Sequence, residues 1–323
     1  MSSIYLTLVV PVYNEEATIR ESWLVIHEEL VKLQKPYEVI FVDDGSKDHT
    51  NEILIALRGE FPEIKILRFT KNHGHQIAIT AGLDFASGQY TITMDVDLQH
   101  PPHLIPRFLE EAQKGVDIVS GIKEKTINRG FLKNALAYGF YKLLRWIAEI
   151  PIDPHVSDFR LYSYRALQTI NSIRERDRYI RGLVSWTGFK QSYIPYTAPD
   201  RKTGYPKYTL KKLGQLAAYG IFSFSAFPTR LSLYIGFLIV LFNSIFLIGT
   251  IIHKLRHPSV IEGYTTILSF LLFLFSLLFI VLGIIGEYIF RVYQEVKRRP
   301  LYILESHEGL EGRPPLTPSA PIG

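Results

Sequence analysis

Cysteine is absent from the 323 residues of the chain. Disulfide bonds and thiolate metal sites are therefore excluded, and a reducing compartment is the simpler location. A secretory signal peptide is not expected either, because the apolar stretch 6–10 is too short and no basic residue precedes it. The glycine-rich turn G-x-G-x-x-G is also missing, since Tyr13-Asn14-Glu15-Glu16 follows the first predicted strand. A dinucleotide-binding Rossmann domain is thereby disfavoured, because its pyrophosphate needs bare backbone at that turn.

Hydrophobic residues make up 47% of the chain, and they are unevenly distributed. Residues 1–208 have the mixed, charged composition of a soluble domain, whereas residues 231–290 contain two long apolar runs. The net charge of +5 suits an anionic membrane surface or phosphate ligands. The length allows one sizeable core and an accessory part.

Short strand-like runs alternate with amphipathic segments in the first half of the chain. The predicted strands are Leu6–Val12, Glu38–Val42, Ile64–Phe69, Tyr90–Met94 and Val116–Ser120. The predicted helices are Glu15–Leu33, Thr50–Leu57, Gln76–Ala86 and Pro102–Lys114. This alternation predicts an α/β domain with a mainly parallel sheet. Ligands of such domains bind beyond the carboxyl ends of the strands.

Acidic residues follow two of these predicted strands. Asp43-Asp44-Gly45-Ser46 ends the second strand, and Asp95-Val96-Asp97-Leu98-Gln99 follows the fourth. The first motif alone is ordinary turn chemistry, and an isolated D-x-D arises by chance about once in a chain of this size. Together, at one rim of a sheet, they indicate a site for a metal ion and the hydroxyl or imide groups of a nucleotide. Hard oxygen ligands favour Mg²⁺ or Mn²⁺.

Four histidines near this predicted rim offer an alternative metal site. They are His73, His75, His100 and His103. The neighbouring D-x-D-x-Q favours oxygen ligands over histidine nitrogens.

The second half of the chain predicts two transmembrane helices. Residues 231–252 carry no charge, and residues 265–290 carry only Glu287. Each run exceeds the roughly 20 helical residues that a hydrocarbon core of about 30 Å requires. Two buried helices of a soluble domain are the alternative. Seven basic residues flank the runs, against two in the loop between them, which predicts both termini and the catalytic half in the cytoplasm.

The remaining segments complete the predicted organisation. Residues 131–150 and 209–227 have the basic, amphipathic pattern of helices in the headgroup plane, although the first could instead pack on the sheet. Glu287 and Arg291 form an i,i+4 pair that is structural in our interpretation. We predict a catalytic domain at 1–208, a juxtamembrane helix at 209–229, two spans within 230–291, and a partly disordered cytoplasmic tail at 292–323.

Five segments, in this order and at this spacing, resemble a known family. They are VVPVYNEE, VDDGSKDHT, KNHGHQIAITAGLDFASG, MDVDLQHPP and SDFRLYSYRA. The chain resembles the polyprenyl-phosphate glycosyltransferases of glycosyltransferase family 2, relatives of dolichol-phosphate mannose synthase. The two apolar runs point to the bactoprenol (undecaprenyl-phosphate) glucosyltransferase subgroup. The resemblance covers about residues 5–295.

The resemblance implies a GT-A fold, a divalent metal (Mg²⁺ or Mn²⁺), and transfer of one sugar, with inversion, to a polyprenyl phosphate at the cytoplasmic leaflet of the inner or plasma membrane. UDP-glucose is the subgroup's usual donor, while GDP-mannose, UDP-GlcNAc or an aminoarabinose nucleotide would need only small pocket changes.

The resemblance also assigns residues to the two substrates. It places the nucleotide against Pro11, Tyr13, Glu15, Asp43, Asp44, Asp95 and Asp97, and the metal on Asp95, Asp97 and Gln99. It places Asp158 and Arg201 at the reacting centre and the phosphates near Lys123, Arg129, Arg201 and Lys207. The chain departs from the family at Gly121-Ile122-Lys123, where many relatives have an arginine, and at Pro206, where a serine is common.

Two further interpretations are weaker. A processive polysaccharide synthase would carry Q-x-x-R-W, but Arg145-Trp146 lacks the required glutamine. A membrane scaffold or lipid-sugar translocase would not need a complete metal-binding motif. We expect no nucleic-acid partner. Glycines in the apolar runs would permit close helix contacts, so a homo-oligomer stays open. Asp158 could serve as a base or as a positioning group, since an acceptor phosphate with a second pKa of about 6 needs no strong base.

Overall fold

The computed structural model describes residues 4–124, 156–176, 178–197 and 263–310, with isolated helical positions between 238 and 256. The chain divides into two compact units. The first contains the described residues up to 197 together with 300–310, and the second contains the described residues from 238 to 299. Each unit is described separately below.

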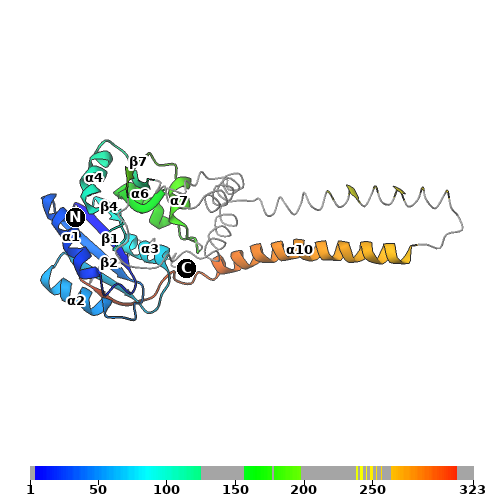
Figure 1. Ribbon diagram of the computed structural model, residues 1–323, viewed down its shortest axis with the longest axis horizontal. Helices are drawn as coiled ribbons and strands as arrows, with labels where there is room; N and C mark the ends of the chain where they lie inside the picture. The colour runs from blue at the N-terminus through cyan, green and yellow to red at the C-terminus, as the bar shows by residue number, and fades with distance from the viewer. Residues whose placement is uncertain are drawn as a thin grey trace, which may run out of the picture. The chain divides into compact units, whose positions relative to one another are not determined.

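One mixed sheet organises the first unit (Figure 1). Its strand order is β7-β5-β6-β4-β1-β2-β3-β8. Its strands are β1 (Leu6–Val12), β2 (Tyr37–Asp43), β3 (Ile64–Phe69), β4 (Tyr90–Thr93), β5 (Ile118–Lys123), β6 (Val156–Ser163), β7 (Gln191–Tyr196) and β8 (Leu304–Glu308). The β4-β1-β2-β3 core is parallel, as the sequence predicts. β6 runs antiparallel to both β4 and β5, and β8 runs antiparallel to β3. β5 and β7 are parallel.

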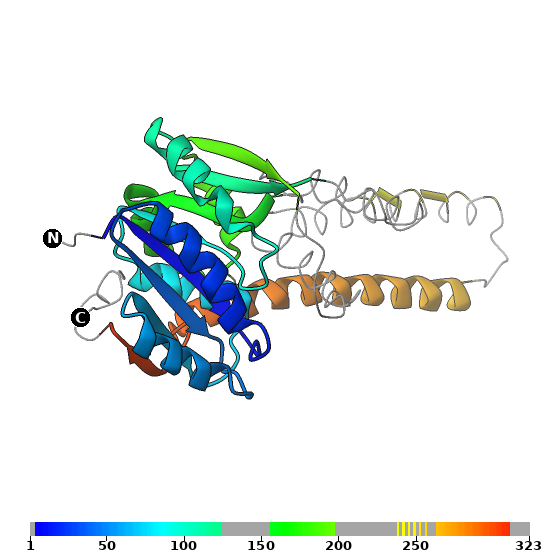
Figure 2. The same ribbon diagram turned by 60° about the vertical axis from the view of Figure 1, so that its left-hand side comes forward.

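Helices cover both faces of this sheet (Figure 2). Buried side chains of α1 (Ile19–Lys32), α2 (Thr50–Glu60) and α4 (Ile105–Gln113) pack in one cluster. Those of α3 (His75–Phe85), α6 (Tyr164–Ser172) and α7 (Ile180–Trp186) pack in the other. A short 3₁₀ turn, η1 (Pro102–Leu104), precedes α4. The result is a three-layer α/β/α arrangement, as the resemblance to a GT-A fold leads us to expect.

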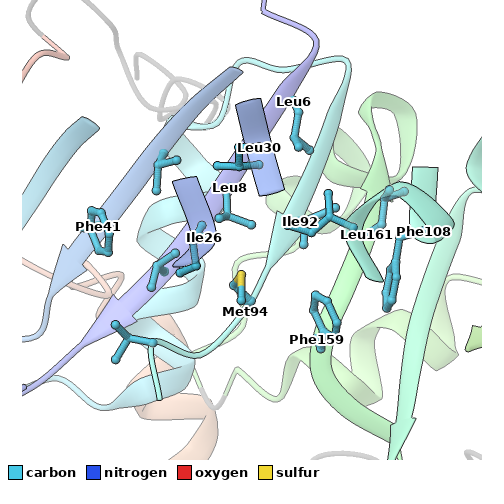
Figure 3. Packing of buried hydrophobic residues seen from close by; sticks show 14 of the residues in the cluster. Leu6, Leu8, Ile26, Leu30, Phe41, Ile92, Met94, Phe108, Phe159 and Leu161 are labelled. Atoms are coloured by element: carbon cyan, nitrogen blue, oxygen red, sulfur yellow. The ribbon is translucent and has the colours of Figure 1, made fainter. Parts of the chain in front are cut away.

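Strand β1 shows why the sequence folds this way. All seven of its residues are buried, because a parallel strand in a three-layer domain has apolar neighbours on both faces. Leu6 and Leu8 point into the cluster that also holds Ile26 and Leu30 of α1 (Figure 3). Val9 points the opposite way, into the second cluster. Burying each such side chain contributes about 1.5–3 kcal/mol.

Strand β8 was not predicted from the sequence. Residues 304–308 lie in the segment that we expected to be a cytoplasmic tail, and they extend the sheet beyond β3. Leu310 is buried in the cluster that contains α3 and α6. Residues 311–323 lie outside the described part of the chain.

The second unit contains α10 (Tyr264–Val296), a helix of 33 residues. At 1.5 Å per residue it is about 50 Å long. Arg291 Nε donates to Glu287 Oε1 at 3.0 Å, so the expected i,i+4 pair forms. The predicted span 265–290 falls within α10, while 231–252 lies outside the described residues apart from isolated helical positions. Within the described part of the chain, no helix meets the combined requirement of length and apolar character for crossing a membrane.

Candidate active site

The carboxyl ends of β1, β2 and β4 lie at one edge of the sheet, because these neighbouring strands are parallel. Asp43 is the last residue of β2 and pairs in register with Val12, the last residue of β1. Asp95 follows two residues after Thr93, where β4 ends. The two predicted acidic motifs therefore share one rim.

The loops after β1 and β2 are joined by hydrogen bonds. The Asn14 N–H donates to Ser46 Oγ at 3.0 Å, and the Lys47 N–H donates to Asn14 Oδ1 at 2.9 Å. Asn14 has a φ of 53°, a left-handed conformation that asparagine tolerates better than most residues. The Glu15 carboxylate accepts a hydrogen bond from the Thr18 hydroxyl at 2.8 Å. Glu15 thus helps to fix the start of α1.

Asp43 is fully buried, and its two carboxylate oxygens differ. Oδ1 accepts the Ser46 N–H at 2.8 Å. Oδ2 is also buried, but it accepts no hydrogen bond within the described residues. Arg68 Nε lies 3.7 Å from it, which is beyond hydrogen-bond range. Burial raises the pKa of Asp43, while the Ser46 hydrogen bonds and the Arg68 charge oppose that rise. A buried, unsatisfied carboxylate oxygen at a sheet rim can accept an N–H of a ligand.

Asp44 holds the loop that leads into α3. Its Oδ1 accepts the His73 N–H at 2.6 Å, and its Oδ2 accepts the Gly74 N–H at 3.0 Å. Burial raises the pKa of Asp44, and these two hydrogen bonds oppose the rise. Gly45 has a φ of +70°, and a Cβ there would lie 2.6 Å from the Lys71 carbonyl carbon. The loops after β2 and β3 can approach this closely only because position 45 is glycine.

The D-x-D-x-Q segment forms a tight loop after β4. Leu98 has a φ of 57°, and the Gln99 N–H donates to Asp97 Oδ1 at 3.1 Å. The Asp95 N–H donates to His100 Nδ1 at 2.9 Å, so that nitrogen acts as an acceptor. The 3.6 Å separation between His100 Nδ1 and Asp95 Oδ2 is therefore not an ion pair. Asp95 is partly exposed and Asp97 is exposed, as expected of carboxylates that meet a solvated cation.

Asp158, on β6, is paired with an arginine that the sequence did not reveal. Arg181 Nε donates to Asp158 Oδ1 at 2.9 Å, and its Nη2 donates to Oδ2 at 2.8 Å. Gln76 Nε2 donates to the same Oδ2 at 3.3 Å, while Gln76 Oε1 accepts the Ile180 N–H at 3.2 Å. The first residues of α3 and α7 are thereby fixed around one carboxylate. Burial alone would raise the pKa of Asp158, but the neighbouring Arg181 and His75 charges hold it well below 3.8.

His75 lies between the two acidic parts of the site. Its Nε2 is 3.5 Å from Asp95 Oδ1 and 3.8 Å from Asp158 Oδ2. Burial alone would lower the pKa of His75, but the two carboxylates raise it to about 9. The imidazole is thus a cation that links the D-x-D loop to β6.

The other predicted site residues are placed as follows. Pro11 is buried within β1, and Tyr13 is partly buried just after it. Lys123 ends β5 and pairs in register with Tyr196 of β7. Arg129, Arg201 and Lys207 lie outside the described residues. Within the described residues, no group of three or more His, Asp and Glu side chains could by itself hold a metal ion, and this applies to the D-x-D loop as well as to the four histidines.

Sequence reasoning missed two arginines of this rim, Arg68 and Arg181. Their partners lie 25 and 23 residues away along the chain, and each contact depends on strand order rather than on a local motif. His75 was considered only as a metal ligand. The sequence gives no signal for its position between two carboxylates.

The rim can perform three chemical tasks. The D-x-D loop presents hard oxygen atoms to a divalent cation. Asp43 presents a buried acceptor to an N–H donor. The Asp158–Arg181 pair offers a fixed charge arrangement, because both carboxylate oxygens already accept hydrogen bonds.

Known proteins match this chain in sequence or in structure. Residues 7–170 match the family described as Glycosyl transferase family 2. An uncharacterized glycosyltransferase of Bacillus subtilis (strain 168), YkcC, is 38% identical over 310 residues, which are 96% of each chain. The SfII prophage-derived bactoprenol glucosyl transferase of Shigella flexneri is 40% identical over 94% of this chain and 99% of its own. A solved glucosyl-3-phosphoglycerate synthase from Mycobacterium tuberculosis, in complex with UDP, covers 67% of this chain and 76% of its own, with 20% identity and a TM-score of 0.44.

Proposed function

Because the chain belongs to glycosyltransferase family 2, we propose that it transfers a single glucose from UDP-glucose to a polyprenyl phosphate and inverts the anomeric carbon. The observation that carries this proposal is the 40% identity to a bactoprenol glucosyl transferase over 94% of the chain. The site geometry supports it. Separate groups at one rim suit a nucleobase, a metal-bound diphosphate and a charged reacting centre.

The nucleobase would bind at Asp43. Its buried Oδ2 accepts no hydrogen bond within the described residues, and the imide N–H of uracil would satisfy it. Asp44 is better explained as a support for the pocket, because its carboxylate already accepts two backbone N–H groups. For the same reason we propose that Glu15 supports the loop instead of contacting the nucleotide, since its carboxylate accepts a hydrogen bond from the Thr18 hydroxyl.

The D-x-D-x-Q loop fits a divalent cation that is shared with a diphosphate. Asp95, Asp97 and Gln99 offer two carboxylates and an amide oxygen, which is the donor set that Mg²⁺ or Mn²⁺ prefers. Asp95 contacts histidine nitrogens only at 3.5 and 3.6 Å, so no short hydrogen bond from these rings competes for its oxygens. The missing ligands would come from the nucleotide. When bound, the cation would stabilise the negative charge that develops on the leaving diphosphate by several kcal/mol.

Asp158 acts in this proposal as a fixed anion. A phosphate monoester has a second pKa of about 6 and is mostly dianionic at pH 7, so its attack on the sugar needs no strong base. Asp158 holds Arg181 by two hydrogen bonds and lies beside the cationic His75. Its contribution is to orient these cations at the place where two anionic substrates must meet. Lys123, Arg129, Arg201 and Lys207 remain our candidates for the acceptor phosphate.

We further propose that the protein is attached to the cytoplasmic face of the inner or plasma membrane. A polyprenyl phosphate stays in the bilayer, so an enzyme that acts on it needs contact with the headgroups. The apolar runs 231–252 and 265–290 support two spans. The pairing of β8 with β3 is compatible with two spans, because the chain leaves the catalytic unit and returns to it. If the intervening residues cross the membrane, they do so an even number of times.

The decisive experiment uses the purified full-length protein with undecaprenyl phosphate and a panel of nucleotide sugars. Mass spectrometry of the lipid fraction, with and without EDTA, identifies the product. We expect a glucosylated lipid from UDP-glucose, which disappears when EDTA is added. The absence of lipid-linked sugar from every donor would refute the proposal. Transfer from a different donor alone would revise only the sugar.

A further inference from the structure

The segment 302–310 is attached to the catalytic unit by several kinds of contact. Backbone pairing joins β8 to β3, and the Thr70 N–H donates to Ile303 O at 3.1 Å. The Tyr302 ring stacks on Phe69 with 5.3 Å between centroids, and its hydroxyl donates to the buried Asp84 at 2.9 Å. These contacts hold β8 in a defined register against β3.

Arg68, on β3, lies between a carboxylate of β2 and a carboxylate of β8. Arg68 pairs in register with Asp43 of β2 on one side and with Ser306 of β8 on the other. Its Nε lies 3.2 Å from Glu305 Oε2 and 3.7 Å from Asp43 Oδ2. A register irregularity between Arg68 and Phe69 accompanies this arrangement. The C-terminal strand is therefore separated from the rim carboxylate by a single guanidinium.

The two distances have different consequences for Asp43. At 3.7 Å the guanidinium is close enough to favour the charged carboxylate but too far to form a hydrogen bond. Arg68 Nε itself makes no hydrogen bond within the described residues. If the Arg68 side chain moved about 0.8 Å nearer, it would satisfy Oδ2 and remove the acceptor that a nucleobase needs. The contact with Glu305 opposes that movement, because the glutamate attracts the same nitrogen from the other side.

We propose that Glu305 is a positioning residue for nucleotide binding: it holds Arg68 beside Asp43 but outside hydrogen-bond range, which leaves Oδ2 open to a nucleobase N–H. This inference rests on the proposed nucleoside role of Asp43. It assigns a function at the rim to the C-terminal strand, which is more than 200 residues away from Asp43 along the chain. The base it fits carries a ring N–H donor, such as the imide N–H of uracil or the lactam N–H of guanine.

The test measures binding rather than turnover. Isothermal titration calorimetry is done on the full chain in detergent with Mn²⁺ present. It compares the affinity for a nucleoside diphosphate with the affinity for inorganic pyrophosphate. The nucleotide is UDP or GDP, whichever the wild type binds more tightly. Glu305→Gln should weaken nucleotide binding by about 3–10-fold, the loss of part of one hydrogen bond to a charged acceptor. It should leave pyrophosphate binding within twofold, because pyrophosphate has no base.

Glu308→Gln is the matched control. Glu308 lies on the same strand, but its carboxylate is 4.0 Å from the Arg58 guanidinium and is not paired with Arg68. The nucleotide affinity of the Glu308→Gln variant should therefore stay within twofold of the wild type. Asp43→Asn provides the reference and should lose at least about tenfold in nucleotide affinity. A thermal melt checks that β8 remains docked in each variant.

Two results would overturn the inference, and they are distinguishable. If Asp43→Asn loses nucleotide affinity and Glu305→Gln does not, Glu305 has no positioning role, and the proposed nucleoside pocket stands. If Asp43→Asn binds the nucleotide as tightly as the wild type, the nucleoside pocket itself is wrong, and the role of Glu305 falls with it. An equal loss of nucleotide and pyrophosphate affinity in Glu305→Gln would also refute the inference, because it indicates a general disturbance of the rim.

Discussion

Replacing Asp158 with asparagine separates a catalytic base from a fixed anion. The substitution keeps the shape of the side chain and one acceptor oxygen for Arg181, but it removes the charge and the ability to accept a proton. Loss of an essential base costs about 10²-fold or more in turnover. The wild-type carboxylate is already hydrogen-bonded at both oxygens, and its pKa lies well below 3.8. We therefore expect Asp158→Asn to keep at least about a tenth of the wild-type kcat.

The same substitution should lower the stability of the domain. Removing one partner of a fully buried ion pair costs about 3–5 kcal/mol, but Arg181 is 27% exposed, so we expect roughly 2 kcal/mol. That loss corresponds to a decrease in Tm of about 4–8 °C for a domain of 150–250 residues. Because the folded-state pKa of Asp158 is lowered, its stabilisation is present above about pH 4 and is lost as the pH falls through the folded-state value. The Tm difference between wild type and variant should thus shrink in acid.

The assay compares initial rates of lipid glucosylation, UDP affinity and thermal melts for Asp158→Asn, Arg181→Gln and the double variant. The double variant should lose less stability than the sum of the single losses, because the two side chains form one unit. Asp117→Asn is the matched control, since its carboxylate pairs with Arg165 at 2.7 Å away from the rim. A 10²-fold or greater fall in kcat, in a folded Asp158→Asn variant with normal UDP affinity, would refute the fixed-anion interpretation and identify a base.

Three further predictions concern the metal, a loop and the C-terminal segment. Removal of divalent ions with EDTA should abolish sugar transfer, and Asp97→Asn should raise the Mn²⁺ concentration for half-maximal activity by at least about tenfold; activity unaffected by chelation would contradict the metal assignment. Gly45→Ala should cost roughly 2 kcal/mol or more in denaturant unfolding, because its φ is +70° and the new Cβ meets the Lys71 backbone. Tyr302→Phe should cost about 1.5 kcal/mol through the lost hydrogen bond to Asp84; an unchanged unfolding midpoint would show that the contact is not formed in solution.

The central strands could be predicted because they are buried on both faces. Such strands appear in the sequence as short apolar runs, and the predicted Leu6–Val12 and Ile64–Phe69 coincide with β1 and β3. Strand β6 contains buried polar residues that interrupt the pattern, among them Arg160, whose Nε donates to Ser120 Oγ. Strand β8 has the polar sequence LESHE, and it forms because β3 offers an unpaired edge. Neither has a local hydrophobic signal that could identify it.

The residues of the candidate site likewise fall into some that the sequence could locate and some that it could not. Asp43 and Asp95 could be located because strand ends in α/β domains meet at one rim, which is a rule of topology. Arg68 and Arg181 could not, because a basic residue on a strand or helix carries no mark of the carboxylate that it will meet. Arg181 itself lies on α7, and the second carboxylate beside Arg68 belongs to β8; the sequence pattern predicted neither of these elements.

Four aspartates lie at the rim, and they differ in their surroundings more than in their sequence motifs. They are Asp43, Asp95, Asp97 and Asp158. Asp158 has a bidentate arginine, so its charge is already balanced and it can orient cations but accept little more. Asp43 is buried with an arginine held just outside hydrogen-bond range, which leaves an oxygen for a neutral N–H donor. Asp95 and Asp97 are more exposed and sit one residue apart, where their mutual repulsion favours a divalent cation between them. Three environments on one sheet edge thus match the three roles that we propose, a positioning group, a base-recognition group and a metal-binding pair, although all four side chains are aspartates.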